Sequence, residues 1–278
     1  MKLACLFTVV VCLLPVSNGF FFGGPDWNGL KVTWGLSPFG SNFVRMPRTV
    51  RQAGQMGFRR ISHCTENPRF RGNRYMKDND TAVILLFDKN GYIAGIQAGI
   101  PNNLPDNYPP PTMKPPFLED GHQLAITAYF VDPATICTLG RTQDEFNSEG
   151  TGTNLYLQNG TDPERDSILI PRRQQDIGST RWVEGRCFFT MGKHYWYDVT
   201  VDMNCNYGFP GFLMYNGGEL NGFGWAFQTG LLTSPRYEHP DSSVLGRFIT
   251  PVPTCLRRTP GFSTLHIYMT NSPRTNFC

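Results

Sequence analysis

Six cysteines beyond residue 19 constrain the fold of this 278-residue chain more than any other feature. The segment before them combines Lys2, an apolar run from Leu3 to Pro15, and small residues ahead of Phe20. That order is typical of a secretory signal peptide, and the run is too short to span a membrane as a helix. We therefore expect cleavage after residue 19, and a secreted, extracellular protein in an oxidising environment.

An even number of cysteines in a secreted chain predicts three disulfides. The six are Cys64, Cys137, Cys187, Cys205, Cys255 and Cys278. Of the fifteen pairings that six cysteines allow, pairing of neighbours along the chain predicts Cys64–Cys137, Cys187–Cys205 and Cys255–Cys278. Two N-glycosylation sequons, at Asn79 and Asn159, agree with secretion and predict a glycoprotein.

The composition favours strands over helices, because 29 glycines, 22 prolines and 13% aromatic residues accompany only 17% charged residues. Apolar runs flank Asn-Gly turns at 81–100 and 212–227, the strongest hairpin signals. Further strand candidates lie at 30–34, 123–131, 155–158, 167–170, 187–191, 195–201, 247–249 and 263–269. We predict an all-β sandwich or barrel of many short antiparallel strands, braced by disulfides. At most one or two short helices are expected, one of them at 47–60 with Thr49 as cap; an α+β fold is the alternative.

Residues 20–278 are enough for a single β-rich domain. The proline-rich stretch 101–116 is interpreted as a surface excursion of that domain, with a linker between two domains as the alternative. A net charge of +3 gives no indication of nucleic-acid binding. After the N-terminal run, no apolar stretch reaches the length of a membrane span.

Two short polar constellations are candidates for chemistry. Glu119, Asp120 and His122 lie where the proline-rich stretch meets a predicted strand, and they could act as acid and base or hold a divalent metal. The simpler interpretation is a solvated turn that needs no cofactor. His194, Trp196 and Asp198 alternate along a predicted strand, so one face could bind a sugar or a cation. The alternative there is cross-strand aromatic packing.

The one clear charge asymmetry lies between Arg45 and Lys77, where Glu66 is the only acid. Arginine suits planar anions, so this segment predicts an anionic polysaccharide or an acidic matrix protein as partner. A solvated basic surface is the alternative. The candidate residues besides Lys77 are Arg45, Arg48, Arg51, Arg59, Arg60, Arg69, Arg71 and Arg74.

Three functions remain open from the sequence. The first is a secreted, disulfide-stabilised glycoprotein that acts by binding, within an extracellular matrix, mucus or a mineralised layer. The second is a secreted metal-assisted hydrolase or lyase centred on Glu119, Asp120 and His122. The third is a carrier of an apolar ligand, because β-barrels can hold such ligands.

Overall fold

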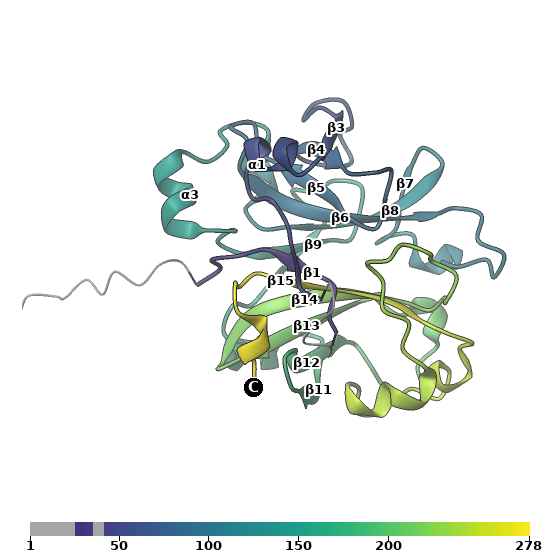
Figure 1. The fold of residues 1–278 in the computed structure, drawn as a ribbon. Coiled ribbons are helices and arrows are strands. Elements are labelled where there is room, and N and C mark those ends of the chain that lie inside the picture. The colour runs from purple at the N-terminus through teal and green to yellow at the C-terminus, as the bar shows by residue number, and fades with distance from the viewer. Residues whose placement is uncertain (1–25, 36–41) are drawn as a thin grey trace, which may run out of the picture.

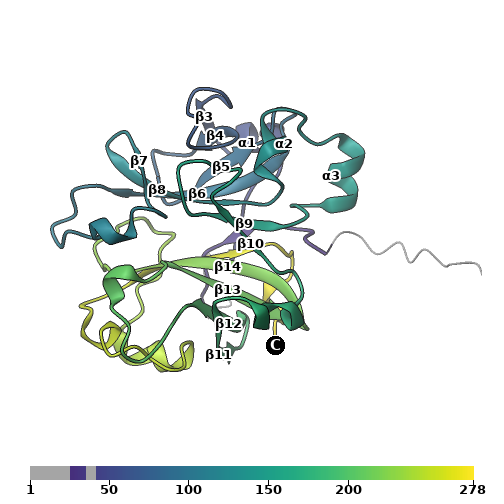
Figure 2. The same cartoon turned by 180° about the vertical axis from the view of Figure 1, so that it is seen from behind.

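Two antiparallel β-sheets face each other across a shared apolar core (Figures 1 and 2). The computed structural model describes residues 26–35 and 42–278, so the predicted signal peptide and its cleavage site lie outside the described residues. The predicted disulfide-braced all-β fold is confirmed. Both sheets are meanders, in which most neighbouring strands also follow one another in the sequence.

The eight-stranded sheet is built from residues 59–170 in the order β10-β9-β8-β6-β5-β4-β3, with β7 paired to β8. Its strands are β3 (Arg59–Ser62), β4 (Asn73–Met76), β5 (Ile84–Phe87), β6 (Ile93–Pro101), β7 (Leu118–Asp120), β8 (Gln123–Tyr129), β9 (Leu155–Gln158) and β10 (Ser167–Ile170). The hairpin expected at 81–100 is formed by β5 and β6.

The seven-stranded sheet takes its strands from residues 182–268 and adds the two N-terminal strands at one side, in the order β11-β12-β13-β14-β15-β1-β2. Its strands are β11 (Trp182–Phe188), β12 (Gly192–Tyr197), β13 (Gly211–Asn216), β14 (Glu219–Phe227), β15 (Ser263–Tyr268), β1 (Lys31–Val32) and β2 (Val44–Arg45). Because β1 pairs with β15, the start of the described chain is tied to its end.

Helices are short and peripheral. They are α1 (Val50–Gln55), α2 (Pro133–Ile136), α3 (Gln143–Glu149) and six 3-10 turns, η1 (Pro111–Met113), η2 (Gln174–Ser179), η3 (Cys205–Tyr207), η4 (Ser242–Arg247), η5 (Leu256–Arg258) and η6 (Pro273–Thr275). Thr49 caps α1 as expected, accepting a hydrogen bond from the backbone of Gln52. Within the described ranges, no helix is long and apolar enough to cross a membrane.

Alternation along the strands of the seven-stranded sheet places apolar side chains on both of its faces. On β13, Leu213 and Tyr215 join the core between the sheets, whereas Phe212 and Met214 belong to a separate cluster on the outer face. The same strands therefore supply two apolar surfaces, and the outer one must also be shielded from water.

The proline-rich stretch 101–116 is more than a solvated loop. Leu104, Tyr108 and Met113 are buried, and they belong to the core between the sheets together with Phe117, which follows the stretch. The rings of Tyr108 and Phe117 both pack against Phe227 of the opposite sheet. The excursion thus supplies apolar contacts that link the two sheets.

One predicted disulfide is confirmed, and the other two pairings are wrong. Cys64 bonds to Cys137 as expected, but Cys187 bonds to Cys278 and Cys205 to Cys255. Cysteines that are consecutive in the sequence need not lie close in space, because a long connection can carry one of them to a distant part of the sheet. The C-terminal segment runs back beside the end of β11, and the segment after β14 folds back over η3, which brings the Cα atoms of the bonded pairs within 6.1 and 6.0 Å.

Candidate ligand-binding cavity

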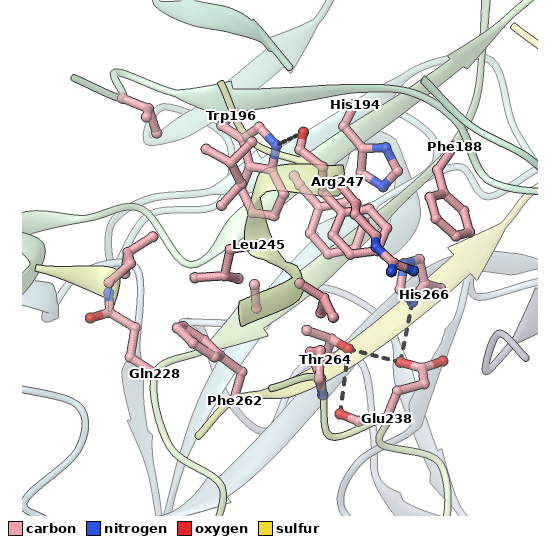
Figure 3. A pocket seen from close by; sticks show the side chains of 18 of the residues that line it. Phe188, His194, Trp196, Gln228, Glu238, Leu245, Arg247, Phe262, Thr264 and His266 are labelled. Carbon is pink, nitrogen blue, oxygen red and sulfur yellow. Dashed lines mark hydrogen bonds and ion pairs between the residues drawn. The ribbon is translucent and has the colours of Figure 1, made fainter. Parts of the chain in front are cut away.

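A cavity of about 390 Å³ lies against the outer face of the seven-stranded sheet (Figure 3). Its other wall is the covering segment, residues 228–262, which connects β14 to β15 and contains η4 and η5. The volume falls within the range of small-molecule binding sites, which is about 300–1,000 Å³. The cavity therefore lies where the second apolar face of the sheet requires a cover.

The covering segment is attached to the sheet at several points. The Cys205–Cys255 disulfide fixes its C-terminal part. The carbonyl of Phe248 accepts hydrogen bonds from the backbone of Arg186 and from Nε1 of Trp196, each at 3.0 Å. These attachments hold the covering segment at a distance from the sheet that leaves space between their side chains.

Aromatic and aliphatic side chains make most of the lining. Phe212 and Trp196 point outward from β13 and β12, and Leu245 and Phe262 approach them from the covering segment. The other apolar residues on the lining are Trp34, Phe188, Met191, Val199, Met203, Phe209, Ala226, Val244, Phe248, Ile249 and Leu256. Such a surface favours an apolar ligand, because contact with it removes hydrocarbon from water on both sides.

A small polar group interrupts this lining on one side. Glu238 accepts hydrogen bonds from Nδ1 of His266 and from the hydroxyl of Thr264, each at 3.1 Å, and also from the backbone N–H of Trp34. The carboxylate is thus held by three donors, and it fixes the imidazole ring of His266 in place. Figure 3 shows this group beside the apolar side chains.

His194 is the second imidazole on the lining and is almost completely buried. Burial is the main reason why its pKa falls to about 3, and the nearby His266 lowers it further. Its Nδ1 lies 3.2 Å from the carbonyl of Arg186, so the neutral ring can donate a hydrogen bond there. At neutral pH, His194 therefore adds no charge to the cavity.

Arg247 is the one basic residue of the lining whose charge is independent of pH. It is exposed at the end of η4, and Figure 3 shows its guanidinium group reaching toward His266. It has no ion pair within residues 26–35 and 42–278. A cationic group without an ion-pair partner among the described residues thus lies beside a mostly apolar cavity.

The three residues of the predicted sugar or cation site do not lie together in the structure. His194 and Trp196 share the outer face of β12 and line the cavity, with their rings nearly parallel. Asp198 lies beyond the end of the strand, is exposed, and forms an ion pair with Arg181. Asp198 is not part of the cavity lining.

The acidic turn connects β7 and β8. Asp120 points to Arg74 and forms an ion pair with it, while Glu119 and His122 are exposed. Burial alone would raise the pKa of Asp120, but hydrogen bonds from Arg74 and Gln123 and the Arg74 charge outweigh it and lower the pKa. In the part of the chain that the structure describes, no three potential ligands among His, Cys, Asp and Glu gather as a metal site.

The arginines of the predicted anion-binding segment have several different environments. Arg74 is buried in its ion pair with Asp120, and Arg71 pairs with Glu164 at 2.9 Å. Arg69 donates a hydrogen bond to the carbonyl of Glu119. These three side chains hold the outer layer of the eight-stranded sheet together.

The remaining cations of that segment are freer. The exposed ones are Arg45 on β2, Arg51 on α1, and Arg59 and Arg60 on β3; Arg48 and Lys77 are half-buried. Lys31, from elsewhere in the sequence, lies near Arg45 and also near Arg274. Burial and then the charges of Arg45 and Arg274 lower the pKa of Lys31.

The two sequons differ in accessibility. Asn79 is exposed in the turn before β5, whereas Asn159 is half-buried at the end of β9.

Sequence reasoning missed the covering segment and the residues Glu238, Arg247 and His266. One available signal was the outward-facing positions of β13 and β15, because Phe212, Met214 and Tyr268 are too apolar for a solvated face. Comparison of the chain with protein-family models, curated proteins and solved structures found no match.

Proposed function

We propose that this protein binds a small apolar ligand in the cavity beneath the covering segment. The observation that carries the proposal is the aromatic lining on the outer face of the seven-stranded sheet, where the covering segment leaves about 390 Å³ of space. A face that only needed protection from water would be expected to pack closely against its cover.

Secretion fits this proposal, since a carrier outside the cell would keep an apolar molecule from water. Three disulfides are typical of proteins that mature in an oxidising compartment. The exposed sequon at Asn79 could hold a glycan without disturbing the fold. The metal-assisted hydrolase or lyase has less support, because Asp120 is already engaged by Arg74.

Titration with the apolar fluorophore N-phenyl-1-naphthylamine tests the proposal. The wild-type protein should bind one equivalent with enhanced emission. Val244→Trp on the covering segment and Ala226→Trp on β14 each place a large side chain into the lining, so both should weaken binding at least about tenfold.

Leu169→Trp is the matched control, because Leu169 is exposed on β10, away from the cavity lining. It should leave the affinity unchanged, and thermal unfolding should show that all variants are folded. Failure of the wild type to bind the fluorophore would contradict the proposal. So would equal binding by the cavity-filling and control variants.

A second candidate function, binding of an anionic matrix component, is favoured by the cluster of Lys31, Arg45 and Arg274. Lys31 and Arg45 both approach Asn271, Lys31 through the backbone carbonyl at 2.7 Å and Arg45 through the side-chain oxygen at 3.5 Å. None of the three cations forms an ion pair with a described carboxylate. A sulfated polysaccharide could therefore neutralise several cations at once.

Elution from a heparin column tests this surface. Arg45→Gln combined with Arg274→Gln should lower the salt concentration needed for elution. Arg59→Gln combined with Arg60→Gln removes the same charge from exposed positions on β3 and should have a smaller effect. Equal elution of both double variants would show that only the total charge matters.

A further inference from the structure

We propose that the cavity selects an apolar ligand that carries an acidic headgroup, with the headgroup between Arg247 and His266. This inference rests on the proposed function, and it defines the chemical class of the ligand. The class is an aliphatic or cyclic hydrocarbon that ends in one carboxylate.

Arg247 supplies the one permanent positive charge of the lining. Two other charged side chains on the lining, Glu238 and Asp241, are already engaged. Glu238 is held by its three donors, and Asp241 caps η4 by accepting a hydrogen bond from the backbone of Ser243 at 2.8 Å. Arg247 has no such partner among the described residues, so an anion from outside the chain is the group it can still bind.

His266 supplies a second polar contact. Its Nδ1 is committed to Glu238, which sets the orientation of the ring and leaves Nε2 without a hydrogen-bond partner in the described residues. Nε2 can accept a hydrogen bond from a carboxylic acid, or donate one to a carboxylate after protonation. In either case, the acid and the imidazole share one proton and together form a neutral pair. The negative charge that remains beside this pair is that of Glu238, which the guanidinium group of Arg247 can balance.

The rest of the cavity suits the hydrocarbon part of such a ligand. Figure 3 shows Phe262 and Leu245 away from the guanidinium group of Arg247, with Gln228 farther along the same side. Gln228 already donates to the carbonyl of Cys205. His194, next to the proposed headgroup position, is neutral at physiological pH, because its pKa is about 3. The polar contacts are thus concentrated at one end.

Dodecanoate and dodecan-1-ol, which have the same chain length, test the proposal by displacing N-phenyl-1-naphthylamine. The wild type should bind the acid about tenfold more tightly than the alcohol, as expected for a charge-assisted hydrogen bond. Arg247→Met keeps an apolar stem and removes the charge, so this preference should disappear while the affinity for the alcohol stays the same. Arg258→Met is the control, because Arg258 is exposed on η5 and does not line the cavity.

The outcomes separate the two proposals. If the alcohol binds the wild type as tightly as the acid, or if Arg247→Met weakens both ligands equally, the acidic headgroup is overturned while an apolar site remains. If neither the fluorophore nor either ligand binds to the wild type, the proposed function itself fails.

Discussion

The outer faces of the two sheets are covered in different ways. On the eight-stranded sheet, two small, closely packed apolar clusters accompany a polar network. In that network, Arg74, Gln97 and Thr127 form a buried chain of hydrogen bonds at 2.8 Å, and Asp120 completes it through its ion pair with Arg74. On the seven-stranded sheet, the corresponding layer is aromatic and includes a cavity. Polar groups require close, directional partners, whereas an apolar layer can leave a space open to a ligand.

Each of the two covers is braced by one disulfide, which allows a direct comparison. Cys64–Cys137 braces the cover of the eight-stranded sheet, and Cys205–Cys255 braces the covering segment of the cavity. The closed loops span 73 and 50 residues, so loss of either disulfide should destabilise the protein by a similar amount, about 4 kcal/mol.

The largest effect is expected when both cysteines of one pair are replaced by serine. Unfolding in urea measures the loss of stability, and titration of the folded fraction measures ligand binding. Loss of Cys205–Cys255 should reduce both stability and affinity for N-phenyl-1-naphthylamine, because it releases one wall of the cavity. Loss of Cys64–Cys137 should reduce stability alone. If loss of either disulfide changed the affinity equally, the covering segment would have no special role in ligand binding.

The next effect concerns the buried ion pair. Asp120→Asn should cost about 3 kcal/mol of unfolding free energy, because the charge of Arg74 is left without compensation. Asp198→Asn changes an exposed pair with Arg181 and should cost less than about 1 kcal/mol. Similar costs would show that the polar network of the eight-stranded sheet adds no special stability.

Asp120 also gives that network an acid dependence. Its pKa in the folded protein lies below the ordinary value of 3.8, so the stabilisation is complete above that value. It is lost as the pH falls through the lowered pKa. The wild type should therefore lose more stability than Asp120→Asn below about pH 4. Parallel curves for the two proteins would contradict the assigned role of Asp120.

A second pH effect is expected from the cavity. The unfolded chain protonates His194 near pH 6.5, whereas the folded protein keeps it neutral down to about pH 3. Stability from this group is therefore complete above pH 6.5 and declines as the pH falls toward 3. His194→Phe should show a shallower decline in urea midpoint between pH 7 and pH 4. His122→Phe, at an exposed position, should follow the wild type.

Much of the fold follows from local patterns in the sequence. The Asn-Gly turn with its apolar flanks predicts the β5–β6 hairpin, and Thr49 predicts the start of α1. Alternation also places His194 and Trp196 on one face of β12. These features depend on residues that are close together in the chain.

The covering segment and two disulfides could not be predicted in the same way. They depend on a long return of the chain over β11–β15, which brings Glu238 to His266 and Cys205 to Cys255. Periodicity reports which positions of a strand are apolar, but it does not say what covers them. The acidic turn was locally conspicuous, yet its key carboxylate is engaged by Arg74, 46 residues earlier in the chain.

Crystallography of the protein with 12-bromododecanoate tests the central claim most directly, because the anomalous signal of bromine locates the hydrocarbon end of the ligand. We expect a peak between the outer face of the seven-stranded sheet and the covering segment, near Leu245 and Phe262. The peak should be absent in Val244→Trp under the same conditions. A bromine peak only elsewhere on the protein, or a cavity that stays empty at saturating ligand, would contradict the claim.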